Sequence, residues 1–226
     1  GNFYYHRISD NLQKIDDSGK VVWEKKIKGQ LLWLGLEGVI LVEDNSLLML
    51  DGVGKEVFQK ADLPENIRVL CVKNDYLLLS GKLNDVEHGI LLYGSGSTVW
   101  QLPIEGEIIS GSLHPKGVYA VFHVIGDNAE SKLIVIGPRG EYLVDSIFEV
   151  PLYQVKAVPH GICVMTGNKA CLIGYDGELM WEYQLSGQVV RGDIGEDGYF
   201  AAVLEDDERI LSQDVLHILI ILSDEG

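Results

Sequence analysis

The stretch DDSGKVVWEKK, residues 16–26, decides the fold of this chain. It places a glycine, Gly19, in a short polar run and a tryptophan, Trp23, four residues later. A glycine within polar residues predicts a tight turn, and the Val-Val-Trp that follows predicts a short strand. The same spacing recurs along the chain, so this one turn and strand define a repeating unit.

Five segments share a turn glycine followed four residues later by a large apolar residue. They are Gly19 and Trp23, Gly54 and Phe58, Gly96 and Trp100, Gly140 and Val144, and Gly177 and Trp181. A second break comes ten residues after each glycine, at Gly29, Pro64, Gly106, Val150 and Gly187. The first four intervals between these turn glycines are 35, 42, 44 and 37 residues, and periods of this length are typical of repeat architectures.

Each unit contains four short strand-like segments. Residues 30–64, for example, read LLWLGLE, GVILVE, SLLMLDG and KEVFQKADL, and no window has a convincing helical period. Four-stranded units at this spacing predict an all-β fold, a β-propeller whose blades pack face to face. In such a fold the glycine closes the hairpin between the third and fourth strands, and the aromatic residue fills the gap between blades.

The chain is therefore predicted to be a single propeller domain spanning residues 1–226. Its blade units are expected at residues 3–29, 30–64, 65–106, 107–150, 151–187 and 188–226. The first unit lacks a first strand and the last lacks a fourth, so four complete blades and an imperfect seam or open edge are expected.

The segments IDDSGKVVW and IGYDGELMW resemble the PQQ-like, or quinoprotein-type, β-propeller repeat. The Asp-box repeat of sialidases spaces glycine and tryptophan by three residues, whereas the spacing here is four. The family that this repeat resembles includes quinone-dependent dehydrogenases. These enzymes look like eight-bladed rings with an adjacent-cysteine disulfide and a calcium site. This chain has no adjacent cysteines and at most six units, so it looks more like the non-catalytic members, which serve as scaffolds or as extracytoplasmic domains of membrane-anchored proteins.

Composition and motifs restrict the function further. The net charge of −16 and the pI of about 4.6 argue against nucleic acid or an anionic membrane surface as a partner. The sequence has three cysteines and no CxxC motif, so all three are expected to be buried thiols. They are Cys71, Cys163 and Cys171. No pair of the six histidines has metal-ligand spacing, and no nucleophile or phosphate-loop motif occurs. We therefore expect no enzymatic activity, no metal site and no cofactor.

Three acidic segments, residues 81–89, 125–131 and 205–214, are interpreted as long loops between second and third strands. All such loops emerge on one face of a propeller, where binding often occurs. The candidate interaction residues are Asp85, Glu87, Asp127, Glu130, Asp206, Asp207 and Glu208. The alternative is a solvated face with no binding role.

The preferred hypothesis is a non-enzymatic binding or scaffold module with a protein partner, which could carry a basic surface. The chain begins Gly-Asn with no apolar run long enough to span a membrane. We expect an extracytoplasmic module tethered through a segment absent from this chain, with self-association possible through an open blade edge. The alternatives are a sensor of a small ligand or cation and, more remotely, a quinone-dependent dehydrogenase.

Overall fold

The computed structural model describes residues 3–8, 10–35, 38–44, 46–114, 119–195, 198–205 and 218–222. These residues form six antiparallel sheets joined in chain order. Each sheet is called a blade below, numbered 1 to 6 from the N-terminus.

Blades 1 to 3 contain strands β1 to β11. Blade 1 comprises β1 (Phe3–Ile8), β2 (Asn11–Asp16) and β3 (Val21–Lys26). Blade 2 comprises β4 (Gln30–Gly35), β5 (Gly38–Glu43), β6 (Ser46–Asp51) and β7 (Glu56–Lys60). Blade 3 comprises β8 (Glu65–Lys73), β9 (Tyr76–Leu83), β10 (Val86–Tyr93) and β11 (Thr98–Pro103).

Blades 4 to 6 contain the remaining strands. Blade 4 comprises β12 (Glu107–Leu113), β13 (Ala120–Ile125), β14 (Ser131–Ile136) and β15 (Tyr142–Phe148). Blade 5 comprises β16 (Leu152–Val158), β17 (Gly161–Thr166), β18 (Lys169–Ile173) and β19 (Leu179–Gln184). Blade 6 comprises β20 (Gln188–Ile194), β21 (Phe200–Glu205) and β22 (Ile218–Leu222).

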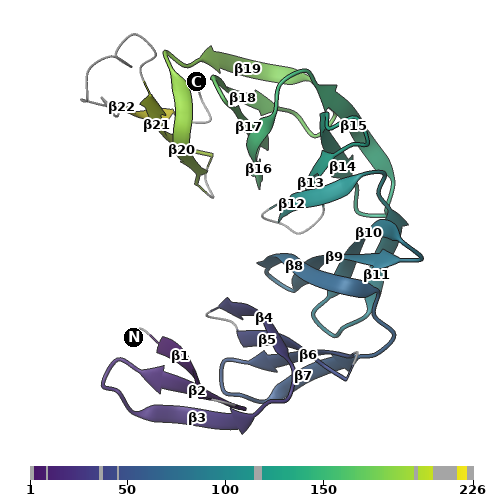
Figure 1. Cartoon of the computed structure of the whole chain (residues 1–226), viewed down its shortest axis with the longest axis vertical. Coiled ribbons are helices and arrows are strands. Elements are labelled where there is room, and N and C mark those ends of the chain that lie inside the picture. The colour runs from purple at the N-terminus through teal and green to yellow at the C-terminus, as the bar shows by residue number, and fades with distance from the viewer. Residues whose placement is uncertain are drawn as a thin grey trace.

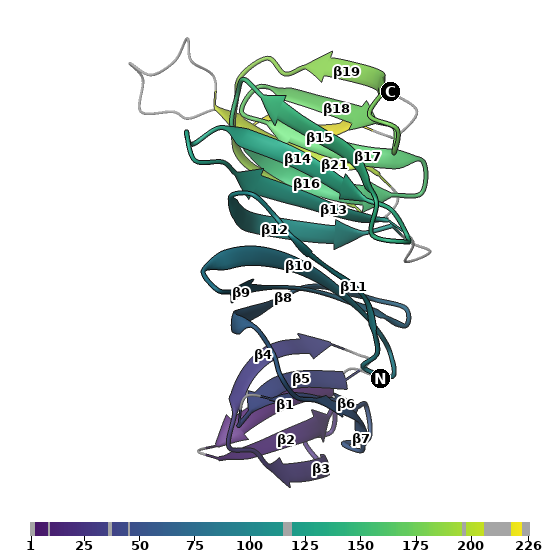
Figure 2. The same ribbon diagram turned by 90° about the vertical axis from the view of Figure 1, so that its right-hand side faces the viewer.

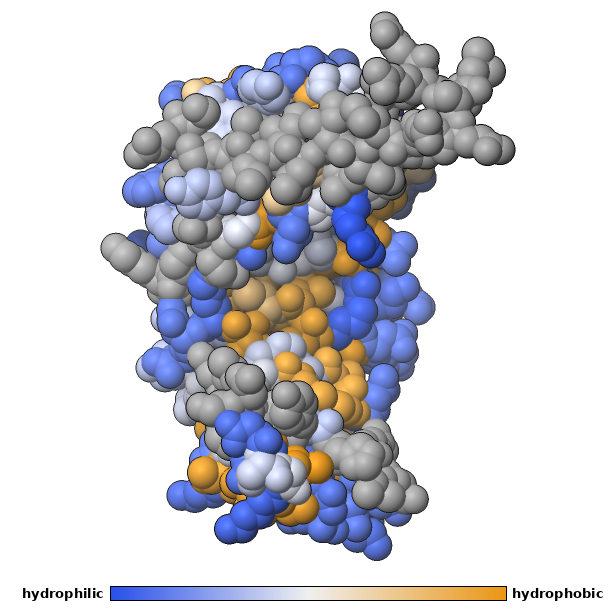
Figure 3. Space-filling view, turned by 90° about the vertical axis from the view of Figure 1, so that its left-hand side faces the viewer, coloured by the Kyte–Doolittle hydropathy of each residue, from blue (hydrophilic) through white to orange (hydrophobic). Residues whose placement is uncertain are grey.

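The blades stand side by side around an open arc, with blades 1 and 6 at its two ends (Figures 1 and 2). In each complete blade the first strand faces the inside of the arc and the fourth lies on its outer rim (Figure 1). Apolar side chains gather in the middle of the molecule when it is seen from the open side (Figure 3). The sequence-based prediction of an all-β fold is confirmed, and the described residues form six sheets, of which the first and last have three strands each.

The five repeat glycines close equivalent turns between the third and fourth strands. Gly19, Gly54, Gly96, Gly140 and Gly177 all have φ between 79° and 88°. In each turn the glycine N–H donates to the carbonyl three residues earlier, as from Gly19 to Asp16 at 3.0 Å. Positive φ is readily adopted by glycine and costs other residues energy, so the turn requires this residue type.

The large apolar residue of each repeat packs on the turn glycine of the next blade. A Cβ atom added to Gly54 would lie 2.8 Å from the ring of Trp23, and one added to Gly96 would lie 2.6 Å from Phe58. Trp100 approaches Gly140 in the same way. Val144 approaches Gly177 likewise, so blades 1 to 4 each place a large apolar side chain, aromatic in all but blade 4, on the bare backbone of the next turn.

Between neighbouring blades the described residues form five apolar clusters, one for each interface. The cluster between blades 3 and 4 joins Trp100 and Leu91 of blade 3 to Phe122 and Ile134 of blade 4. The rings of Trp100 and Phe122 meet edge to face, with centroids 6.4 Å apart. The other four clusters lie between blades 1 and 2, 2 and 3, 4 and 5, and 5 and 6. The core is thus a series of similar layers, and each blade depends on its neighbours to bury both of its faces.

The interpretation of residues 81–89 as a long loop is wrong. β9 and β10 extend to a two-residue turn at Asn84 and Asp85, whose φ angles are 52° and 64°. Gly81 and Gly89 are paired strand residues. An added Cβ would lie 2.8 Å from Ile67 at Gly81 and 2.8 Å from Phe122 at Gly89. The glycines mark close approach of a neighbouring side chain and do not end the strands.

Candidate interaction cleft

Two kinds of connection share one face of the molecule, which we call the cleft face. These are the turns between second and third strands and the links from each fourth strand to the next blade. The turn at Asn84 and Asp85, the link at residues 104–106 and the turn at residues 126–130 lie on this face, and all three contribute to one cleft between blades 3 and 4.

The cleft has a volume of about 470 Å³ and is predominantly acidic. Its lining includes five carboxylate side chains and one ammonium group, from Asp85, Glu87, Glu105, Glu107, Asp127 and Lys82. The carboxylates come from three connections that are separate in the sequence. Their convergence creates a local negative field that would attract a cationic group.

Glu87 plays a structural part in this cleft. It is buried, and its Oε1 atom accepts a hydrogen bond from Nη2 of Arg68 at 2.8 Å. The same Arg68 nitrogen donates to the carbonyl of Ile108 in blade 4 at 2.6 Å, while Arg68 Nε donates to Ser80 Oγ at 3.2 Å. The Glu87 charge is therefore neutralised, and Arg68 fixes blade 3 against blade 4 behind the cleft.

Glu130 lies beside the cleft in a tight turn. The N–H of Gly126 donates to the Glu130 carbonyl at 2.9 Å, and the Glu130 side chain covers Gly126, where an added Cβ would lie 2.3 Å from Oε1. Lys132 Nζ is 3.7 Å from the same carboxylate oxygen. Segment 125–131 is thus a compact turn with a partly neutralised acid.

A second hollow, of about 350 Å³, shares Val86, Ile104 and Glu105 with the cleft. Tyr142 lines it and donates a hydrogen bond from its hydroxyl to the carbonyl of Pro103. Burial, together with the charge of Asp145, raises the pKa of Tyr142. Its hydroxyl therefore stays protonated and serves as a donor that joins the outer strands of blades 3 and 4.

The structure brings together part of the set of residues selected from the sequence. Asp85, Glu87 and Asp127 line the cleft and Glu130 lies next to it. The remaining candidates, Asp206, Asp207 and Glu208, lie outside the described residues. Sequence reasoning missed Glu105 and Glu107. The run Glu-Gly-Glu around Gly106 could have revealed them, because links between blades lie on the same face as the second turns.

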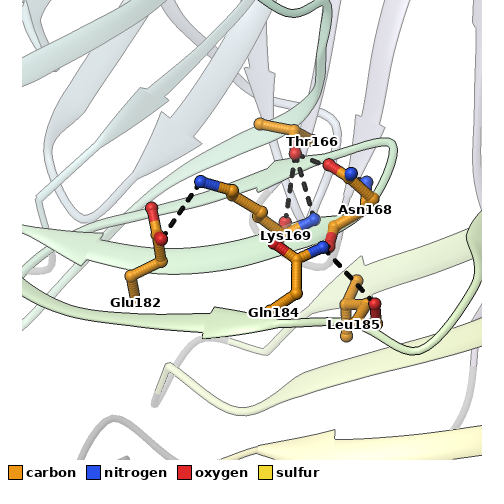
Figure 4. Close-up of polar contacts among 6 residues, drawn as sticks. All are labelled: Thr166, Asn168, Lys169, Glu182, Gln184 and Leu185. Carbon is orange, nitrogen blue, oxygen red and sulfur yellow. Dashed lines mark hydrogen bonds and ion pairs between the residues drawn. The ribbon is translucent and has the colours of Figure 1, made fainter.

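The cleft face of blade 5 is occupied by contacts within the blade (Figure 4). Thr166 Oγ1 accepts a hydrogen bond from the N–H of Lys169 at 3.1 Å, and Gln184 Nε2 donates to the Asn168 carbonyl at 2.9 Å. The ammonium of Lys169 lies 3.1 Å from Glu182. Glu182 of this blade thus has a basic partner on the neighbouring strand.

Within the described residues, no group of three or more His, Cys, Asp and Glu side chains is arranged to hold a metal ion. His123 is buried and lies 3.5 Å from Ser131 Oγ, and burial lowers its pKa. Cys163 and Cys171 are buried thiols that form no disulfide, and burial raises the pKa of Cys171 to about 11. These groups are suited to a structural role, and the acidic lining of the cleft suits it to a basic side chain.

The structure was compared with known proteins. No family model matches the chain, and no curated protein matches it. Among solved structures, it resembles KlHsv2 with loop 6CD replaced by a Gly-Ser linker, at a TM-score of 0.65 and 10% identity over 96% of this chain and 78% of that one.

Two further similar structures are complexes. KlAtg21 bound to the coiled coil of AgAtg16 gives a TM-score of 0.59 at 10% identity, over 95% of this chain and 77% of that one. BBS1N in complex with ARL6DN gives 0.55 at 12% identity, over 88% and 68%. These neighbours are β-propeller proteins. At such low identity the likeness concerns the fold alone, and the six sheets described above have the β-propeller architecture.

Proposed function

We propose that this chain is a non-enzymatic binding or scaffold module that holds a basic segment of a partner protein in the cleft between blades 3 and 4. The observation that best supports this proposal is the acidic lining of the cleft. Four carboxylates meet there beside one lysine, and they belong to Asp85, Glu105, Glu107 and Asp127. Attraction between such a cleft and a basic surface acts mainly on the association rate and weakens with salt. The two complexes among the structural neighbours support a protein-binding role for propellers of this shape.

The test is a triple variant, Asp85→Asn, Glu105→Gln and Asp127→Asn, which keeps side-chain size and leaves the Arg68–Glu87 pair intact. Binding of a fluorescein-labelled lysine-rich peptide would be measured by anisotropy at low and high salt. We expect the variant to bind at least about tenfold more weakly at low salt, and the difference to shrink at high salt.

A control variant neutralises three exposed acids that do not line the cleft, Asp17→Asn, Glu56→Gln and Asp62→Asn, and so has the same net charge as the triple variant. Equal weakening by the two variants would show only a general effect of net charge and would reject the cleft as the site. A third variant, Asp206→Asn with Asp207→Asn and Glu208→Gln, tests whether the acidic run outside the described residues contributes.

We also propose that the module is extracytoplasmic and membrane-tethered through a segment outside this chain. The support is the resemblance of the repeat at Gly19–Trp23 and Gly177–Trp181 to PQQ-like propellers. In the part of the chain that the structure describes, no helix is long and apolar enough to cross a membrane. Fractionation of cells that express the full parent protein tests this location, and recovery with the cytoplasmic proteins would contradict it.

A further inference from the structure

A second groove lies between blades 4 and 5 on the face opposite the cleft face. It has a volume of about 780 Å³. The turns between first and second strands and between third and fourth strands meet there. Its lining comes from both blades: Tyr119, Leu143, His160, Gly174, Tyr175, Asp176, Glu178 and Met180. We call it the rim groove.

Aromatic side chains give the rim groove a fixed base. Tyr119 of blade 4 and Tyr175 of blade 5 are stacked, with ring centroids 4.5 Å apart and an angle of 18° between the planes. His114 meets both rings edge to face. The Tyr175 hydroxyl donates to the carbonyl of Val158 at 2.9 Å, so the ring pair cannot rotate freely and presents a preformed apolar surface.

A bulge in each fourth strand aims one apolar side chain outward. In each of five fourth strands the register with the third strand shifts, and the residue three positions after the turn glycine is the extra residue of the bulge. These residues and their exposed fractions are Val22 46%, Val57 44%, Val99 42%, Leu143 40% and Met180 55%. Bulges redirect side chains in this way at functional positions, and the two larger side chains, Leu143 and Met180, are the ones that line the rim groove.

The charge of the turns also changes along the chain. The residue directly after the turn glycine is Lys20 in blade 1, Lys55 in blade 2, Ser97 in blade 3, Glu141 in blade 4 and Glu178 in blade 5. Glu178 and Asp176 line the rim groove, and none of its described lining residues is lysine or arginine.

The equivalent groove between blades 2 and 3 provides an internal comparison. It has a volume of about 440 Å³, and its lining includes Val57, Phe58 and Tyr76. Blade 3 carries Ser97 at the repeat position that Glu178 occupies in blade 5, and the acidic residue in this lining is Asp75. The repeat therefore produces the hollow in both places, and the groove between blades 4 and 5 differs in having Leu143 and Met180 at the bulge positions and two carboxylates in its lining.

We propose that the rim groove binds a segment of a partner protein that carries a large apolar side chain next to a lysine or arginine. The apolar side chain inserts between Leu143 and Met180 onto the tyrosine pair, and the cation faces Asp176 and Glu178. An apolar anchor in a preformed pocket with a charged edge is the usual arrangement of a strong interface contact. Because Leu143 and Met180 are themselves exposed on the outer rim, the groove is open to a protein surface and does not enclose a small ligand.

The test uses a fluorescein-labelled amphipathic peptide of leucine and lysine, with a leucine and glutamate peptide for comparison. The double variant Leu143→Ser with Met180→Ser removes the anchor, and Glu178→Lys reverses the charge. We expect each to weaken binding of the leucine–lysine peptide at least about tenfold, as for loss of a central contact. The glutamate peptide should bind wild type more weakly than the lysine peptide.

Matched controls use the same repeat positions away from the groove. Val22→Ser with Val99→Ser changes two exposed bulge residues, and Asp17→Lys makes the same charge change as Glu178→Lys. Both controls should bind the peptide within about twofold of wild type, and urea unfolding should show that all variants are folded. Equal weakening by Leu143→Ser/Met180→Ser and by its control would overturn the proposal, as would absence of binding to wild type at about 100 μM peptide.

This inference stands apart from the cleft between blades 3 and 4. The cleft variant, in which Asp85, Glu105 and Asp127 are neutralised, should still bind the leucine–lysine peptide at the rim groove. Its affinity is compared with that of the Leu143→Ser/Met180→Ser variant. If the cleft variant loses the leucine–lysine peptide and the groove variants do not, the peptide binds in the cleft and the rim groove proposal fails.

Discussion

The contact between an aromatic side chain and the turn glycine of the next blade is the repeated unit of this structure at the scale of single residues. Trp100 is buried against Phe122 and Gly140 and lies at the centre of the interface between blades 3 and 4. Truncating a large buried aromatic side chain removes its apolar contacts and leaves a cavity that neighbours fill only partly.

We predict that Trp100→Ala lowers the free energy of unfolding by about 3–5 kcal/mol, the usual range for a buried aromatic. Urea unfolding followed by circular dichroism measures this, with Val99→Ala at the exposed neighbouring position as the control. A loss below about 1 kcal/mol for Trp100→Ala would contradict the role assigned to this residue.

The turn glycines allow the cost of backbone conformation to be separated from the cost of packing. Around Gly19 an added Cβ meets nothing within 4 Å, whereas around Gly96 it lies 2.6 Å from Phe58. Both have positive φ, 84° and 81°. We predict that Gly19→Ala costs about 1–2 kcal/mol from backbone strain alone, and that Gly96→Ala costs more. Equal losses in urea unfolding would show that the aromatic contact contributes nothing.

At the scale of whole elements, a small polar network joins three strands across the interface of blades 4 and 5. His123 on β13 lies 3.5 Å from Ser131 Oγ on β14, which accepts a hydrogen bond from the N–H of Leu152 on β16 at 3.1 Å. Burial lowers the pKa of His123, so the folded protein resists protonation there more than the unfolded chain does.

We predict that this histidine makes stability depend on pH. Its contribution is present above the unfolded pKa of about 6.5 and is lost as pH falls below that value toward the lowered folded pKa. As the pH falls from about 7 to about 5, the free energy of unfolding of wild type should therefore decrease more than that of His123→Gln. A constant difference across this range would reject the prediction.

Elements also show what the sequence could and could not reveal. The turns at Gly19 and Gly177 were predictable, because positive φ restricts the residue type at one fixed position of a repeat. The strands of blade 3 were not, because Gly81 and Gly89 resemble turn residues until the side chains that fill their missing Cβ positions are known. The neutralisation of Glu87 was hidden for a similar reason, since Arg68 belongs to another strand and also bonds to the next blade.

At the scale of the whole molecule, the six blades form an open arc (Figure 1). Blade 1 has three described strands and blade 6 has three, and the four between them are complete. The strands at the ends of such an arc are edges that can pair with another chain. Because each blade contacts mainly its neighbours, stability is expected to be a sum of similar interface terms along the arc.

We predict that small-angle X-ray scattering will give a radius of gyration above the value of about 17 Å expected for a compact domain of this length. Blades 1 and 6 lie apart at the two ends of the arc (Figure 1), and this separation raises the radius of gyration. The molecular mass from forward scattering, taken over a dilution series, identifies self-association. A monomer with a radius at or below about 17 Å would indicate a closed, compact molecule and would contradict the open arc.

The contact of aromatic on glycine has a direction, and this has a consequence for how such a chain can evolve. In blades 1 to 4 the large apolar side chain, aromatic in all but blade 4, packs on the glycine turn of the following blade. Gly19 in blade 1 has nothing against it within 4 Å, and Trp181 in blade 5 is half-buried beside Phe200 of blade 6. A tandem duplication of one repeat in the gene would therefore insert a blade that already fits both neighbours, so the number of blades can change without a new interface having to arise.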